Sequence, residues 1–217
     1  MRADQLPIVV GVGQYSKRLE DVTRAPHPVE MMAIAARVAA EDAGAPGLLR
    51  DIDTAIAVNV LAWSYPDPVA LLAELVGAHP RTRIYTSIGG NTPQWQVNET
   101  AERIAAGECQ VALIAGAEAM YSLRRARKTG VELPWPPRGG SPAMVGDTRW
   151  GNTSAQMSHR GQMPTQVYPL FENALRAARG RTVAEQREFL GRFCARFATV
   201  TTGCCSPRRW CRRWGRW

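Results

Sequence analysis

Few residues in this chain of 217 combine a nucleophile with a base at a spacing that would support catalysis. The five cysteines and three histidines show neither the spacing of a metal site nor that of a disulfide framework. We therefore expect no bound metal and no cofactor held by the protein. Cys109 and Cys194 fall within regular apolar patterns, which is typical of small core side chains. His27 and His159 fall in loop-like stretches, where we expect solvated imidazoles.

A glycine turn is the segment best suited to bind a ligand. A β-prone run, Ile84–Ile88, ends at Gly89 and Gly90, whose backbones can adopt angles that other residues avoid. Thr92 is a good N-cap and Pro93 suits the first helical position. The following helix would direct its N-terminus beyond the strand end, where it favours anions and developing negative charge. A threonine nucleophile would need a nearby base, so we expect Thr92 to act as a cap.

The elements around this turn alternate between strand and helix. Val97, Ala101 and Ile104 recur at helical spacing, Glu99 and Arg103 form an i,i+4 pair, and Gly107 supplies a stop. The order β-α-β-α-β-α-β predicts a layered α/β domain over residues 1–120. The expected elements are strands at 8–12, 52–60, 83–88 and 111–115, and helices at 29–43, 69–76 and 92–106.

The composition changes after residue 120. Residues 121–166 are rich in proline, glycine, arginine and polar residues, which indicates an irregular segment. Helical pattern returns at 168–178, and a further helix begins at Thr182, whose spacing to Glu185 predicts a capping box. We assign residues 121–200 to a second, partial domain.

The formal charge of +8 is concentrated in residues 201–217, which contain five arginines, three tryptophans and no acid. This tail lacks the apolar periodicity of a helix or strand. We interpret it as disordered or translated out of frame, which an uninterrupted reading frame in independent isolates would contradict. The alternative is a tail that binds nucleic acid or an anionic membrane. With no long apolar run and no signal peptide, we expect a cytoplasmic protein without a membrane partner.

Two separated motifs resemble the thiolase superfamily, in particular its sterol-carrier-protein-type branch. The run from Gly116 to Met120, GAEAM, is similar to the AGGxExM signature of that family. Phe171-Glu172-Asn173, followed by Thr182 to Gln186 and Phe189, is similar to the AEN and SRxEQDxF passage of its loop domain. The resemblance covers most of residues 8–200. It implies the N-terminal half of a thiolase-like layered fold plus part of the inserted loop domain, in a truncated chain.

The resemblance also implies a site and a defect in that site. Thiolases are acyltransferases that acylate a cysteine at the start of the helix after the third strand. That position falls at or within one residue of Gly90, so we expect no catalytic residue here. Gly90, Asn91 and Thr92 would line the pocket for a coenzyme A thioester. The missing second half would also leave apolar helical surface exposed.

These features leave three functions open. The first is a thiolase-like protein of acyl-CoA and lipid metabolism, related to acetyl-CoA acetyltransferases and inactive alone. The second is a cysteine-less retro-aldolase of side-chain degradation that works with a zinc-ribbon/OB-fold partner, because aldol cleavage needs an acid or base but no acyl-enzyme. The third is non-enzymatic binding through the tail, although we do not expect a nucleic-acid partner. The resemblance also implies a homodimer through the third strand, residues 83–88.

Overall fold

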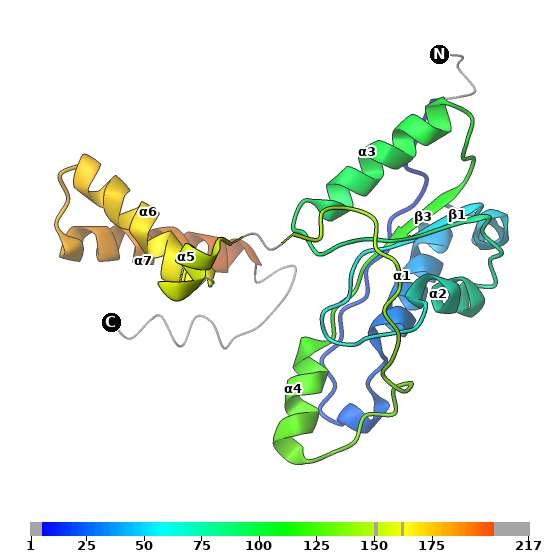
Figure 1. Ribbon diagram of the computed structural model, residues 1–217, viewed down its shortest axis with the longest axis horizontal. Coiled ribbons are helices and arrows are strands. Elements are labelled where there is room, and N and C mark those ends of the chain that lie inside the picture. Colours follow the sequence, from blue (N-terminus) through cyan, green and yellow to red (C-terminus); the bar gives the residue numbers. More distant parts are fainter. Residues whose placement is uncertain (1–5, 150–151, 162, 202–217) are drawn as a thin grey trace. The chain divides into compact units, whose positions relative to one another are not determined.

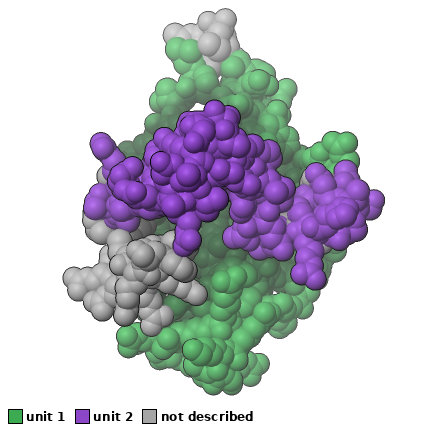
Figure 2. All heavy atoms as spheres, turned by 90° about the vertical axis from the view of Figure 1, so that its left-hand side faces the viewer, with its two compact units in different colours: residues 1–149 green, residues 150–217 purple. Residues whose placement is uncertain are grey.

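The computed structural model describes residues 6–149, 152–161 and 163–201. The chain divides into two compact units, Met1–Arg149 and Trp150–Trp217, which are coloured separately in Figure 2. Residues 202–217 lie outside the described residues, so the interpretation of the tail stays a prediction.

A sheet of three parallel strands, in the order β2-β1-β3, forms the centre of the described part of the first unit (Figure 1). The strands are β1 (Thr54–Ala57), β2 (Thr82–Tyr85) and β3 (Ala112–Ala115). Ile56 of β1 pairs with Ile84 on one side and Ile114 on the other. All four residues of β1 are buried, which is typical of a parallel strand covered on both faces. The predicted layered α/β class is confirmed.

Three helices cover this sheet. They are α1 (Pro28–Asp42), α2 (Pro68–Val76) and α3 (Thr92–Ala105). Helices α1 and α2 pack against each other and against the sheet, whereas α3 contacts β3. Because β2 and β3 flank β1 on opposite sides, right-handed connections place α2 and α3 on opposite faces. The observed bounds of α1 and α2 agree with the predicted helices to within one residue.

A helix that the sequence did not predict, α4, follows β3. It comprises Met120–Thr129 and ends at Gly130, which has a φ of 68°. Leu123, Ala126 and Trp135 are buried, and Leu123 and Trp135 belong to the main apolar core. The sequence assigned these residues to the second domain. In the structure they pack in the core of the first unit. Two short 3-10 helices complete this unit, η2 (Val22–Arg24) and η3 (Pro46–Asp51).

The predicted first strand is not part of the described sheet. Residues 8–12 have no strand partner, and Ile8 is 75% exposed. The segment instead follows α1, where the Val12 N–H donates to Asp42 Oδ2 at 2.9 Å. A Cβ atom at Gly13 would lie 2.0 Å from the Ala35 carbonyl oxygen. The glycine therefore permits close contact with a helix, and the β-prone valines remain exposed.

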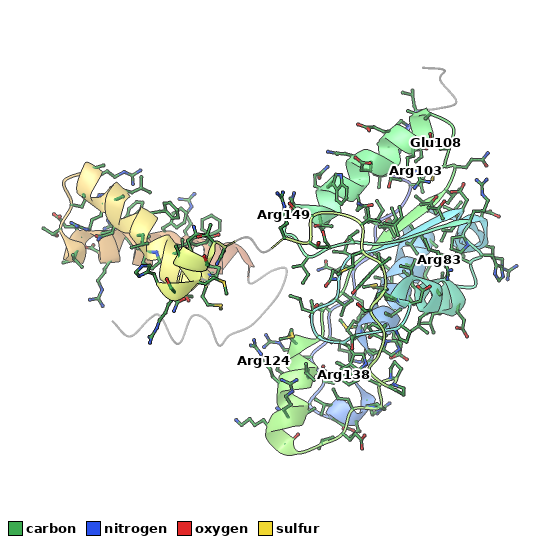
Figure 3. The ribbon with its side chains drawn as sticks, in the orientation of Figure 1. Arg83, Arg103, Glu108, Arg124, Arg138 and Arg149 are labelled. Carbon is green, nitrogen blue, oxygen red and sulfur yellow. The ribbon has the colours of Figure 1, made fainter. Side chains whose placement is uncertain are left out.

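The most deeply buried row of α3 is not the apolar row that the sequence predicted, of which Ala101 and Ile104 are only half-buried. The buried side chains are polar, and comprise Thr92, Gln96 and Thr100. Val97, from the predicted apolar row, is 41% exposed. The expected Glu99–Arg103 pair is also absent: Glu99 accepts from Trp95 Nε1 at 3.1 Å, and Arg103 lies 3.8 Å from Glu108 (Figure 3). Helical spacing alone could not show which row would face the sheet.

The described part of the second unit is helical. Its helices are α5 (Ser154–Ser158), α6 (Pro164–Ala178) and α7 (Val183–Thr201). The predicted capping box is confirmed, because the Glu185 N–H donates to Thr182 Oγ1 and the Thr182 N–H donates to Glu185 Oε2. Gln186 is buried, donates through Nε2 to Glu172, and accepts from Arg181 Nη1 at 3.2 Å. Residues of the thiolase-like motif thus join α6 to α7.

Much of the apolar surface of this unit is exposed. Phe171 is 63% exposed, and Tyr168, Leu170, Phe193 and Phe197 are similarly uncovered within their unit. Cys194 is exposed too, so its predicted role as a core side chain is wrong. The aromatic rings of α7 instead contact one another along the helix: Phe189 stacks on Phe193 with 6.2 Å between the ring centroids, and Phe193 and Phe197 are tilted at 4.9 Å. Within the described residues, no helix has the length and apolar character needed to cross a membrane.

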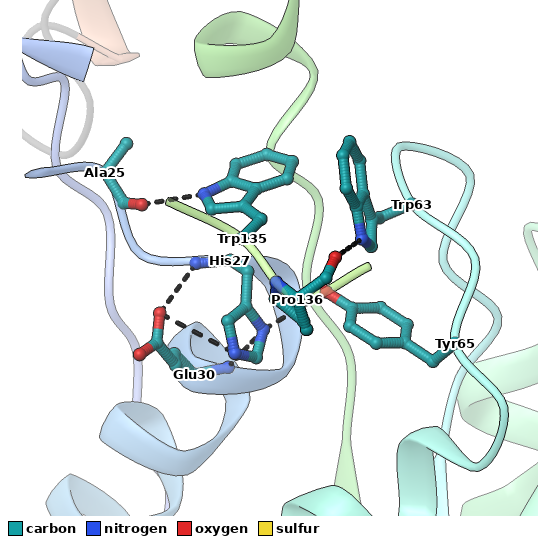
Figure 4. Close-up of polar contacts among 7 residues, drawn as sticks. All are labelled: Ala25, His27, Glu30, Trp63, Tyr65, Trp135 and Pro136. Atoms are coloured by element: carbon teal, nitrogen blue, oxygen red, sulfur yellow. Dashed lines mark hydrogen bonds and ion pairs between the residues drawn. The ribbon is translucent and has the colours of Figure 1, made fainter. Parts of the chain in front are cut away.

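One buried histidine fixes the start of α1. His27 is 7% exposed, and its Nδ1 accepts from the Glu30 N–H at 3.3 Å and lies 3.1 Å from the Tyr65 hydroxyl (Figure 4). Glu30 Oε2 in turn accepts from the His27 N–H at 2.9 Å. Burial lowers the pKa of His27, and the Glu30 carboxylate opposes this shift. The prediction of a solvated imidazole is wrong for His27 because Tyr65 encloses it, whereas His159 is exposed as predicted.

The contacts of Gln186 predict that it stabilises the second unit. Replacement Gln186→Ala removes the bonds to Glu172 and Arg181, and should lower the free energy of unfolding by about 1 kcal/mol. Urea unfolding followed by far-ultraviolet circular dichroism measures the change. The matched control is Glu188→Ala, which removes an exposed pair with Arg192 and should cost about 0.3–0.5 kcal/mol. Equal losses in the two variants would contradict the assignment.

The position of His27 predicts a pH-dependent stability. Its pKa in the folded chain lies below the ordinary 6.5, so the unfolded chain binds the proton more readily. The free energy of unfolding should therefore fall as the pH drops from about 7.5 to about 5.5. His27→Asn keeps a capping acceptor and should weaken this dependence. Urea unfolding at both pH values tests it, with the exposed His79→Asn as control; an unchanged slope in His27→Asn would refute the prediction.

Candidate active site

The turn after β2 is closed by a segment that is distant in the sequence. The Thr86 N–H donates to the Ala57 carbonyl at 3.1 Å, which extends the pairing with β1 by one residue past the end of β2. The Ser87 N–H donates to the Val145 carbonyl at 2.8 Å, and the Val145 N–H donates to the Tyr85 carbonyl at 2.8 Å. The chain at Val145 thus acts as a short parallel neighbour of β2. It fixes the backbone immediately before the glycine turn.

The three residues predicted to bind substrate lie at the start of α3. Gly90 and Asn91 are exposed, whereas Thr92 is buried. The N-cap is Asn91, whose side chain makes no capping bond, so the prediction of Thr92 as N-cap is wrong. Thr92 is the first helical residue, and its hydroxyl donates back to the Ser87 carbonyl at 3.5 Å. Of these three residues, Asn91 therefore supplies the exposed polar side chain.

Gly90 occupies open space. A Cβ atom there would have no heavy atom within 4 Å, whereas a Cβ at Gly89 would lie 2.6 Å from Thr92 Oγ1. The backbone at Gly90 is also not in the left-handed conformation, because its φ is not positive. Position 90 could therefore carry a side chain without a clash. The sequence leaves it without a nucleophile, although the structure would accommodate one.

The ends of the three strands meet beside this turn, as expected for parallel strands. The Asn59 N–H donates to Thr86 Oγ1 at 3.2 Å, and Asn59 Nδ2 donates to Met144 Sδ at 3.2 Å. Glu118 accepts from the N–H groups of Leu61 and Ala62. The carboxylate of the GAEAM run thus holds the loop after β1 in place. Hydroxyl and amide groups line this edge, and the hydroxyls of Thr86 and Thr92 are buried and bonded within the protein.

Sequence reasoning missed Asn59 and the segment around Val145. The available signal was Gly146, whose φ is 115° and where a Cβ would lie 2.5 Å from Ser87 Oγ. Gly146 lies in a segment rich in glycine and proline, where a glycine is typical of an ordinary loop. No nearby residue in the sequence indicates its contact with Ser87. Only the tertiary contact identifies it as part of the site.

The described thiols and imidazoles lie elsewhere. Cys109 is buried at the opposite end of α3, near Thr54 and Asp53, and burial raises the pKa of its thiol. This confirms its predicted role as a small core side chain. His27 caps α1, and His79 and His159 are exposed. No cluster of three or more metal-ligating side chains occurs in the described part of the chain. None of the described thiols and imidazoles lies at the turn.

Comparisons with known proteins place this arrangement in a structural class. Neither the family models nor the curated protein sequences contain a match to the chain. Among solved structures, the chain is similar to a monomeric SCP2-thiolase-like protein type 1 (STLP1) from Mycobacterium smegmatis, with 28% sequence identity and a TM-score of 0.61. The match covers 93% of this chain and 35% of that protein. The chain therefore spans about a third of that protein's length, and its fold is that of an SCP2-thiolase-like protein.

Proposed function

We propose that this chain is a thiolase-like protein of acyl-CoA metabolism that binds a coenzyme A thioester but does not catalyse thiolysis alone. The observation that carries the proposal is the turn at Gly90, which lies at the N-terminus of α3 and bears no thiol. The likeness in fold to an SCP2-thiolase-like protein supports the ligand class. The Asn91 amide and the helix end supply donors for a thioester carbonyl. A cytoplasmic location is part of the same proposal.

A retro-aldolase is the second candidate. It is favoured by the same absence of a thiol at position 90, because carbon–carbon cleavage of a β-hydroxyacyl thioester requires proton transfer rather than acylation. This function would require a partner of the zinc-ribbon/OB-fold type. Homodimer formation through the third strand is part of this proposal, since β2 lies at the edge of the described sheet and only its end is paired with Val145. Binding by the tail rests on residues outside those described.

Ligand binding and turnover separate these candidates. Isothermal titration calorimetry with acetyl-CoA should show saturable binding, and Asn91→Ala should weaken it by removing the exposed amide. The chain alone should release no thiolysis product from a 3-ketoacyl-CoA. Thiolysis that alkylation abolishes would show that one of its cysteines is catalytic and would refute the proposal. Cleavage of a β-hydroxyacyl thioester would favour the retro-aldolase.

The geometry at position 90 predicts how a restored thiol would behave. In Gly90→Cys the new side chain meets no neighbouring atom, so the fold should persist. The N-terminus of α3 should lower the pKa of this thiol. The pH dependence of its alkylation by iodoacetamide should therefore have a lower midpoint than that of Gly47→Cys, an open position in the six-residue 3-10 helix η3 and not at the N-terminus of a long α-helix. Equal midpoints would show that the helix end does not act on this position.

A further inference from the structure

A groove of about 540 Å³ lies between the end of α4 and the segment that follows it in the first unit. Its volume falls within the usual range of small-molecule sites. None of the residues of the glycine turn lines it. The residues that define it are Trp63, Leu123, Arg127, Leu133, Trp135 and Arg138.

The tryptophans form a preorganised base for this groove. The ring centroids of Trp63 and Trp135 are 5.0 Å apart in an edge-to-face arrangement. Trp63 Nε1 donates to the Pro136 carbonyl at 2.9 Å, and Trp135 Nε1 donates to the Ala25 carbonyl at 2.8 Å (Figure 4). Because both indole N–H groups are used internally, neither ring can donate a hydrogen bond to a ligand. Polar recognition must come from other side chains.

Arg138 supplies a cation that is already held in place. Its guanidinium carbon lies 3.9 Å from the centroid of Trp63, and its Nη2 donates to the Ala62 carbonyl at 3.5 Å. The stacked plane leaves further N–H donors for a ligand, and a guanidinium binds phosphate oxygens in a bidentate manner. Fixing the side chain before binding reduces the entropy that a ligand must offset.

The charge around the groove favours an anion. Arg127 lines it from α4, and Arg124 and Lys128 are exposed on the same helix. In the described residues, no ion pair neutralises Arg127 or Arg138. Figure 3 shows Arg124 and Arg138 with their side chains in the region of α4. Glu132 is the sole acidic residue among those that line the groove.

We propose that this groove binds a nucleoside phosphate. The phosphate group is bound by the guanidiniums of Arg127 and Arg138, and the flat base packs on the Trp63–Arg138 stack. Aromatic bases stack favourably on such surfaces. An apolar peptide would leave both cations unpaired, whereas a nucleoside phosphate uses the charge and the flat surface together. The lining of the groove shares no residue with the glycine turn.

Calorimetric titration of the full chain with adenosine monophosphate tests the proposal. Arg127→Gln and Arg138→Gln should each weaken binding about tenfold by removing a charge-assisted contact. Arg138→Lys should also weaken it, because lysine keeps the charge but loses the planar group that stacks. Arg50→Gln is the matched control, since Arg50 is exposed and lies outside the groove. Unchanged melting temperatures would show that the variants are folded.

Two further ligands test the base and the phosphate contributions to binding separately. Adenosine and inorganic phosphate should each bind more weakly than adenosine monophosphate. Equal binding of inorganic phosphate would refute the role of the stack, and equal binding of adenosine would refute the role of the arginines. No saturable binding of adenosine monophosphate, or an equal loss in Arg50→Gln, would overturn the proposal as a whole. Asn91→Ala should leave the binding of adenosine monophosphate unchanged. A failure of the nucleoside phosphate proposal can therefore be told apart from a failure of the thioester proposal.

Discussion

Burial of β1 on both faces is the constraint on which the first unit depends. Each residue from Thr54 to Ala57 is enclosed, so backbone groups of this strand must pair with β2 and β3 and its side chains must be covered by helices. The parallel register with both neighbours brings three strand ends to one edge. The position of the candidate site follows from this requirement.

At that edge, the turn at Gly90 is open and carries no cysteine. The turn is held by backbone bonds to Val145, and Glu118 fixes the loop after β1. The exposed helix start at Gly90 and Asn91 is then available to a ligand. The groove beside Trp63 and Arg138 combines aromatic surface with unpaired charge, and uses none of these residues. The first unit thus offers two chemically distinct surfaces.

In the second unit, residues of the thiolase-like motif hold two helices together. Glu172 and Gln186, from the two halves of the thiolase-like passage, contact each other between α6 and α7. Arg181 joins them and stacks on Phe189 at 4.4 Å. The phenylalanines Phe171, Phe193 and Phe197 of this hairpin are exposed. Its polar contacts therefore define the hairpin more than an apolar core does.

The sequence alone determined the α/β class, the bounds of α1 and α2, and the capping box at Thr182. These features are encoded within a few residues, through periodicity, caps and stops. Only the tertiary structure showed the burial of His27 by Tyr65, the contact of Val145 with the end of β2, and the core position of Trp135. It also decided that residues 8–12 follow α1 instead of joining the sheet. Each of these features depends on a contact between residues that are distant in the chain. Such a contact produces no recognisable pattern in the sequence around either residue.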